Sequence, residues 1–123
     1  MTIADWCIQE LQHEAVATRK HLERLPEGKF DYAPHPKSMP LGRLAGHLAE
    51  TPSWTKMTVE VDEMVFDPAN FVPFAPTTRE EVLAKFDESL AIGIEALKGV
   101  SDEHLMKNWR LVVGGNVLLE HPR

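Results

Sequence analysis

The sequence predicts an all-α protein, an up-and-down helical bundle with a small β-hairpin near the C-terminus. Apolar residues recur every three or four positions in three long segments, as they do on one face of a helix. Proline-rich connections separate these segments, and Gly114-Gly115 between two short apolar runs predicts a hairpin turn. With 123 residues, 43% of them hydrophobic, the chain is expected to form one domain, residues 1–123, around a single core.

The charge balance excludes several classes of partner. Lys and Arg number 13 against 19 Asp and Glu, and the basic residues are scattered, so no nucleic acid partner and no membrane partner are expected. No segment approaches the roughly 20 consecutive apolar residues that span a bilayer. The single cysteine, Cys7, cannot form an internal disulfide, and the N-terminus does not resemble a signal peptide. A soluble, cytoplasmic protein is therefore expected.

The first helix is predicted from Ile3 to Leu25, where Pro26 and Gly28 end it. Its inward stripe consists of Ile3, Cys7, Leu11, Ala15, Thr18, Leu22 and Leu25. Cys7 is thus predicted to be a small core residue. Residues 29–40 contain three prolines and form a loop, in which Phe30 and Tyr32 are expected to cover the end of the core.

The second helix begins near Ser38 or Met39, with Pro40 in its first turn. Its predicted inward stripe consists of Leu41, Leu44, Ala45, Leu48, Thr55 and Val59, with Trp54 at one edge. Pro52 interrupts this pattern and predicts a kink close to His47. Gly42 and Gly46 resemble a small-residue surface that lets a neighbouring helix approach closely.

Residues 65–76 form a proline-punctuated apolar connection that is expected to pack over the bundle. Thr78 then caps a third helix, in a capping box whose Glu81 carboxylate reaches back, and Gly99 closes it. The predicted inward stripe of this helix is Leu83, Phe86, Leu90, Ile94 and Leu97. A short N-capped segment at Ser101–His104 precedes the hairpin.

His47 is the residue of this sequence that points most clearly to chemistry. It lies between Leu44 and Leu48 on the helical wheel, where it is either a hydrogen-bonded core histidine or a metal ligand. A metal site in a bundle needs convergent ligands from facing helices. No HxxxH, HExxH or pair of ExxH motifs is present. His13, Glu14 and Glu50 offer further donors, although such residues are typical of a solvated face.

Three segments together resemble the DinB family: Ala17–Pro26, Phe30–Met39, and Leu41–Glu50 with Trp54. The likeness continues through Phe86, Leu90, Trp109 and Gly115. This resemblance implies a four-helix bundle and, in many members, a divalent metal such as nickel, zinc or iron held by three histidines. His47 matches the histidine of the second helix. The other two histidines form an HxxxH pair on the last helix, where that spacing puts both rings on one face.

The chain ends at His121-Pro122-Arg123, about where the family's last helix would begin. Two of the three implied ligands are therefore absent, and the metal site is expected to be incomplete, since three protein ligands are the usual minimum. The helices that remain are expected to leave an apolar groove open to water. Such patches seek partners, which predicts a homodimer in which one copy covers the groove of the other.

Three functional hypotheses follow. The first is a metal-dependent enzyme of the DinB type, a transferase or hydrolase acting on a small-molecule substrate, with His47 as a metal ligand. The second is a non-catalytic dimeric interaction module without metal, in which His47 is a polar core residue. The third is a bundle that binds a small ligand through the aromatic residues Trp54, Phe71 and Phe74.

Overall fold

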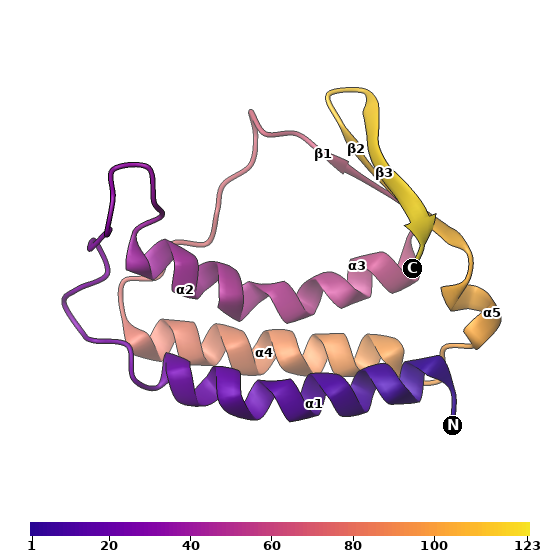
Figure 1. The fold of residues 1–123 in the computed structure, drawn as a ribbon, viewed down its shortest axis with the longest axis horizontal. Coiled ribbons are helices and arrows are strands. Elements are labelled where there is room, and N and C mark those ends of the chain that lie inside the picture. Colours follow the sequence, from indigo (N-terminus) through magenta and orange to yellow (C-terminus); the bar gives the residue numbers. More distant parts are fainter.

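The computed structural model describes residues 1–123, in which helices dominate and a small sheet lies at one side (Figure 1). The helices are α1 (Ile3–Leu22), α2 (Leu41–Glu50), α3 (Trp54–Glu60), α4 (Arg79–Leu97) and α5 (Asp102–Leu105), and the 3-10 turn η1 (Thr51–Ser53) joins α2 to α3. The strands are β1 (Glu63–Phe66), β2 (Asn108–Val113) and β3 (Asn116–Pro122). The mostly helical architecture expected from the sequence is confirmed.

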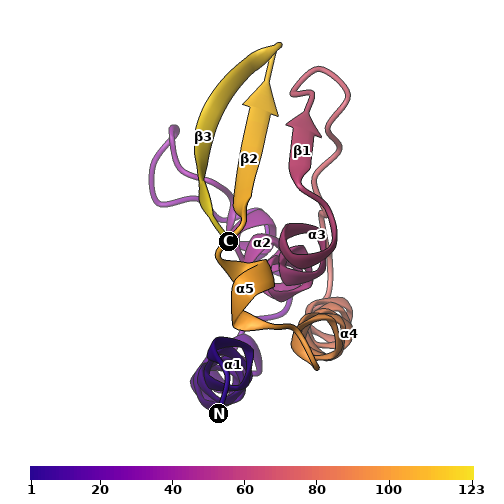
Figure 2. The ribbon, with the colours of Figure 1, turned by 90° about the vertical axis from the view of Figure 1, so that its right-hand side faces the viewer.

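Helix α4 is the centre of the helical layer, since both α1 and the α2–α3 pair pack against it. Seen end-on, the sheet lies on one side of α2–α3, and α1 and α4 lie on the other (Figure 2). None of the helices is long and apolar enough to cross a bilayer. The α2–α3 pair thus has one side turned to the helices and another turned to the sheet.

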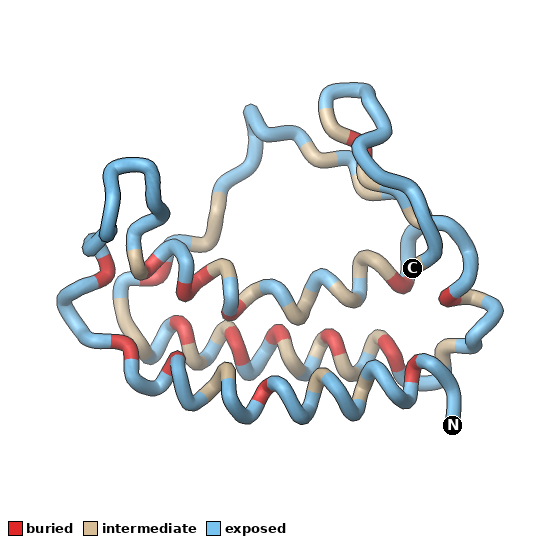
Figure 3. The backbone as a smooth tube through the Cα atoms, in the orientation of Figure 1, coloured by how far each residue is buried: buried red, intermediate tan, exposed pale blue.

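Buried residues gather where the helices face each other (Figure 3). The larger core cluster comprises Ala15, Leu22, Leu25, Phe30, Ala45, Ala49, Val82 and Phe86, and the smaller one comprises Ala4, Val59, Leu97 and Leu105. The residues that α2 buries here are small, which lets the helices approach closely. At the closest point a Cβ atom on Gly93 of α4 would lie 2.6 Å from the Pro52 carbonyl oxygen, so only glycine fits.

Several residues predicted to face inward are exposed. Cys7 is exposed, and Leu44 and Leu48 are 46% and 47% exposed. Tyr32 is 61% exposed, whereas Phe30 is buried as predicted. For Leu44 and Leu48 the cause is that α2 carries two neighbouring apolar stripes, and α4 covers the stripe of smaller residues, which includes Ala45 and Ala49. On α4 the buried stripe is likewise displaced from the predicted one and consists of Val82, Phe86, Ser89, Gly93 and Leu97.

Local signals placed the starts of α4 and α5, whereas α2 begins at Leu41 rather than near Ser38 or Met39, with Pro40 as its N-cap residue. The Thr78 hydroxyl accepts the Glu81 N–H at 3.2 Å at the start of α4, as predicted. The Glu81 carboxylate reaches back to the N–H of Thr77, one residue further than a capping box requires. Ser101 caps α5 by accepting the N–H of His104. Helix α1 ends at Leu22, three residues before the predicted end, because the last residues form turns.

The predicted hairpin is confirmed, but it belongs to a larger sheet. Strands β2 and β3 pair antiparallel, and Gly114 and Gly115 have φ angles of 58° and 79°, which the tight two-residue turn requires. Strand β1 pairs parallel with β2, with Met64 opposite Leu111. Strand β1 was not predicted from the sequence, because a segment of four residues is too short to show a period and this strand forms only by pairing with the distant β2.

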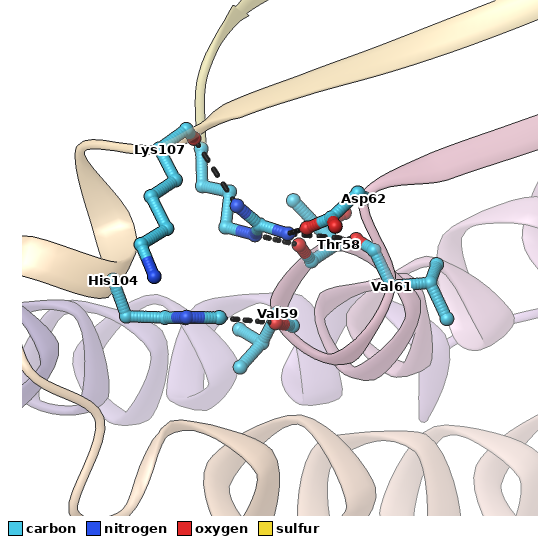
Figure 4. A network of polar contacts seen from close by, with 7 residues as sticks. Thr58, Val59, Val61, Asp62, His104 and Lys107 are labelled. Carbon is cyan, nitrogen blue, oxygen red and sulfur yellow. Dashed lines mark hydrogen bonds and ion pairs between the residues drawn. The ribbon is translucent and has the colours of Figure 1, made fainter.

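Arg123 joins the end of the sheet to the end of α3 through contacts with Thr58, Val61 and Lys107, which Figure 4 labels. Its side chain is only 1% exposed and forms an ion pair with Asp62. Its guanidinium also donates to the carbonyl oxygens of Thr58, Val61 and Lys107 at 2.8, 3.0 and 3.2 Å. Carbonyls at a helix C-terminus have no partner within the helix, so Arg123 satisfies groups that would otherwise need water.

Two further effects support this end of α3. The His104 ring nitrogen Nε2 lies 2.6 Å from the carbonyl oxygen of Val59, so α5 also caps α3 (Figure 4). Hydrogen bonding and charge from Arg123 lower the pKa of Asp62 below its usual value of 3.8. The sheet and α5 are therefore fixed to one end of α3 by polar contacts.

Candidate functional site

A cavity of about 380 Å³ lies between the α2–α3 pair and the sheet. The connection from β1 to α4, residues 67–78, closes part of it. The residues of one wall lie on α2 and α3, except for the first, which lies just before α2. They are Met39, Arg43, His47, Glu50, Trp54, Met57 and Thr58. The other wall consists of Met64, Phe66, Phe71, Pro73, Phe74, Trp109 and Leu111. This volume and this mostly apolar lining are typical of small-molecule sites.

The helical wall is one stripe of the α2–α3 pair. Arg43, His47, Glu50 and Trp54 are separated by four, three and four residues, which places them on the same face. The small residues that pack on α4 occupy a different face of α2. One helix therefore contributes to the core and to the cavity with different side chains.

The turn at Pro52 carries this stripe from α2 into α3. Pro52 has no N–H to donate, and the predicted interruption takes the form of the 3-10 turn η1. The Thr51 hydroxyl donates to the His47 carbonyl, and the Ser53 hydroxyl donates to the Glu50 carbonyl at 2.6 Å. Side-chain hydroxyls thus donate hydrogen bonds to backbone carbonyls at the interruption. Beyond this turn, Trp54 continues the cavity wall that His47 begins.

The opposite wall combines β1, β2 and the connection. Phe66 and Phe71 pack edge to face with their ring centroids 5.1 Å apart. The connection also lies close against α2, because a Cβ atom on Gly46 would lie 2.7 Å from the Pro76 ring and 2.9 Å from the Phe74 carbonyl oxygen. Gly42 similarly contacts Phe30. The prediction that these two glycines face a neighbouring helix was therefore wrong, since irregular segments cover them.

Several polar groups of the cavity lack partners within the chain, although the Thr58 hydroxyl donates to the Trp54 carbonyl oxygen. The His47 ring packs against Trp54, with centroids 5.2 Å apart and planes at 67°, and makes no hydrogen bond. The Arg43 and Glu50 side chains form no ion pair. The indole Nε1 of Trp109 is buried without an acceptor. A buried polar group without a partner is uncommon and raises the free energy of the empty site.

The metal site implied by the resemblance requires three protein ligands. His47 and Glu50 share the cavity wall, but no three His, Cys, Asp or Glu side chains come together where they could hold a metal ion. His13 and Glu14 lie exposed on α1 and do not line the cavity. The residues of one chain therefore do not fit a three-ligand metal site, and the assignment of His47 as a metal ligand stays a prediction.

A second depression, of about 470 Å³, lies between α1 and α3. Ile3, Cys7 and Leu11 line it from α1, and Thr55 lines it from α3. Trp54 borders both this groove and the cavity. The apolar groove that the sequence led us to expect is present, whereas the homodimer expected to cover it stays a prediction.

The structure brings four residues that the sequence pointed to, His47, Trp54, Phe71 and Phe74, to one cavity. Arg43 and the strand residues of the wall were not predicted. The spacing of Arg43 relative to His47 and Trp54 was a usable signal, because it repeats the helical period. No local sequence pattern predicted that strand residues line the cavity, because their position depends on the pairing of β1 with β2.

The fold and the cavity define a small, mostly helical protein with a ligand-sized space between its helices and a short sheet. A family model of the DinB superfamily matches residues 10–114, which include α2, α3, α4 and every residue of the cavity wall. The chain belongs to the DinB superfamily. A search among curated proteins and a search among solved structures gave no match.

Proposed function

We propose that this DinB-superfamily protein binds a small, largely apolar molecule in the cavity between α2–α3 and the sheet. The observation that carries the proposal is the convergence of Trp54, Phe71 and Phe74 with His47 around one space of about 380 Å³. Aromatic rings supply large contact areas at little cost in conformational entropy. Met39, Met57 and Met64 add flexible side chains that adapt to different ligand shapes.

Fluorescence of N-phenyl-1-naphthylamine, a neutral probe that brightens in apolar sites, tests this proposal. We expect saturable binding to the wild-type protein and at least about tenfold weaker binding to Trp54→Ala, because the indole forms part of the cavity wall. Trp6→Ala is the matched control, since Trp6 is 64% exposed and lies outside the cavity. A probe signal that does not saturate, or that both variants change equally, would contradict the proposal.

A second candidate is the metal-dependent chemistry of the DinB type. The free His47 ring on the cavity wall favours it, and superfamily membership makes it relevant. We propose that His47 contributes one ligand to a divalent metal, nickel, zinc or iron, and that the other donors come from a bound molecule or from a second copy. An enzyme of this kind would be a transferase or hydrolase acting on a small substrate.

In this second candidate a homodimer completes a bundle of the four-helix type, with the groove between α1 and α3 covered by the partner. The exposed Ile3 and Cys7, which both line this groove, support such an interface, because exposed apolar surface favours association. Metal analysis of purified protein tests the site, with His47→Ala expected to lose metal and His13→Ala to keep it. Equal metal content in both variants, or a monomer by sedimentation at micromolar concentration, counts against this candidate.

A further inference from the structure

We propose that the molecule bound in the cavity is a monocarboxylate with an apolar body, such as a medium-chain fatty acid or an arylalkanoic acid, and that Arg43 binds its carboxylate. This inference rests on the proposed small-molecule site and adds the chemistry of its ligand. It assigns an orientation to that ligand along α2–α3.

The evidence begins with the pairing of the arginines. Four of the six arginines each lie within 4.0 Å of a carboxylate oxygen, namely Arg19, Arg79, Arg110 and Arg123. Only Arg24 and Arg43 have no acidic partner, although the chain carries 19 acidic residues. Of these two, Arg43 alone lines the apolar cavity. Arg43 is exposed and therefore lies where the cavity opens to water. An anion of the ligand would supply the acidic partner that the chain does not.

The geometry of the guanidinium selects the kind of anion. Its planar arrangement of N–H groups matches a carboxylate with two parallel hydrogen bonds. His47 lies one helical turn from Arg43 on the same wall, and its ring makes no hydrogen bond within the chain. A carboxylate at this end of the cavity therefore meets a positive charge and a second polar group.

The remaining charge on this wall sets the direction of the ligand. Glu50 lies seven residues after Arg43, about 10 Å further along the helix axis. Its carboxylate has no ion-pair partner and would repel a second anion. The apolar body is then directed past His47 towards Trp54, Met57 and Trp109. A monocarboxylate pairs with Arg43 and keeps its single charge away from Glu50, whereas a dicarboxylate of similar length places a second anion close to Glu50.

Displacement of N-phenyl-1-naphthylamine by decanoate, decanol and decanedioate tests this assignment. We expect Arg43→Gln to raise the decanoate concentration needed for half-displacement about tenfold, because a charge-assisted hydrogen bond is lost. The same variant should leave the value for decanol within about twofold, since decanol carries no charge. Arg24→Gln, which removes the other unpaired arginine, should change neither value.

Glu50→Gln provides the second arm. Decanedioate should displace the probe from this variant at about fivefold lower concentration than from the wild type, because the repulsion is removed. If Arg43→Gln and Arg24→Gln weaken decanoate equally, or if Arg43→Gln weakens decanol as much as decanoate, the carboxylate assignment is overturned while the cavity proposal stands. Absence of saturable probe binding to the wild type would remove the cavity proposal and this inference with it.

Discussion

The two faces of the α2–α3 pair differ in how they are filled. The face on α4 carries Ala45 and Ala49, which are 3% and 0% exposed, and Gly93 brings the two backbones close. The face towards the sheet carries His47, Glu50 and Trp54 around a cavity. Small side chains in close contact stabilise the fold, whereas large side chains around an empty space leave room for a ligand. Stability and binding therefore depend on different residues of the same helix.

The end of α3 resembles the packed face, because contacts within the chain hold it in place. Arg123 and His104 bond carbonyls there, so the helix end and the sheet form a fixed unit. The connection over the cavity, in contrast, is mostly exposed, as Figure 3 shows. Substitutions at the packed face and the helix end should therefore reduce stability, and substitutions at the cavity should reduce binding.

The largest loss of stability is expected from Arg123→Met. The variant leaves the carbonyls of Thr58, Val61 and Lys107 without this donor, and we expect the free energy of unfolding to fall by about 3 kcal/mol. Urea unfolding followed by circular dichroism measures it. Arg110→Met is the control, because Arg110 forms only an exposed ion pair with Glu63, and its effect should stay below about 1 kcal/mol. Equal losses in both variants would show that burial of Arg123 is unimportant.

Gly93→Ala should have the next largest effect. The added methyl group would lie 2.6 Å from the Pro52 carbonyl oxygen and 3.4 Å from Leu11 Cδ2, so the backbones must separate. We expect a loss of about 2 kcal/mol in the free energy of unfolding, because the strain outweighs the gain in helix propensity. Glu95→Ala, an exposed change on the same helix, is the control. A stabilised Gly93→Ala variant would mean that α4 and η1 are not held this closely.

Phe71→Ala should separate binding from stability. Phe71 is 45% exposed and lines the cavity, so its removal should lower stability by no more than about 1 kcal/mol. Binding of N-phenyl-1-naphthylamine should weaken severalfold, as a fluorescence titration would show. Val72→Ala is the matched control. Val72 is next to Phe71 in the sequence, but its side chain is 87% exposed and does not line the cavity. A greater loss of stability than of binding would contradict the proposed division between the two faces.

The smallest effect concerns pH. Hydrogen bonding and charge from Arg123 lower the pKa of Asp62 in the folded protein below its usual value of 3.8. A lowered folded pKa means that ionised Asp62 stabilises the fold above about pH 4, and that this contribution is lost as the pH falls through the folded pKa. Asp62→Asn should therefore lose less stability than the wild type between pH 5 and pH 3 in urea unfolding.

The control for the pH experiment is Asp31→Asn, which removes an exposed carboxylate that forms no ion pair in the chain. Its stability should follow the wild-type pH dependence. The Arg19–Asp87 pair, which lowers the pKa of Asp87, remains in both variants and contributes a common background. Parallel curves for Asp62→Asn and the wild type would show that the ion pair with Arg123 does not affect stability in this range.

Local sequence patterns were enough to predict the long helices, the caps of α4 and α5, and the hairpin. Thr78 and Gly99 marked the ends of α4, and Gly114-Gly115 marked the turn between β2 and β3, because these residues act within a few positions of themselves. The sequence also identified the DinB superfamily, which the family model confirms. His47 could be placed on the second helix, since helical period alone fixes which residues share a face.

Which neighbour each helix face contacts depends on long-range packing. Leu44 and Leu48 were predicted to be inward and are exposed, because α4 selects the neighbouring stripe of smaller residues. Strand β1 exists only through its pairing with β2, and Arg123 is buried only because the end of β3 returns to α3. The cavity around His47 depends on all of these long-range contacts, which the local period of a sequence does not encode.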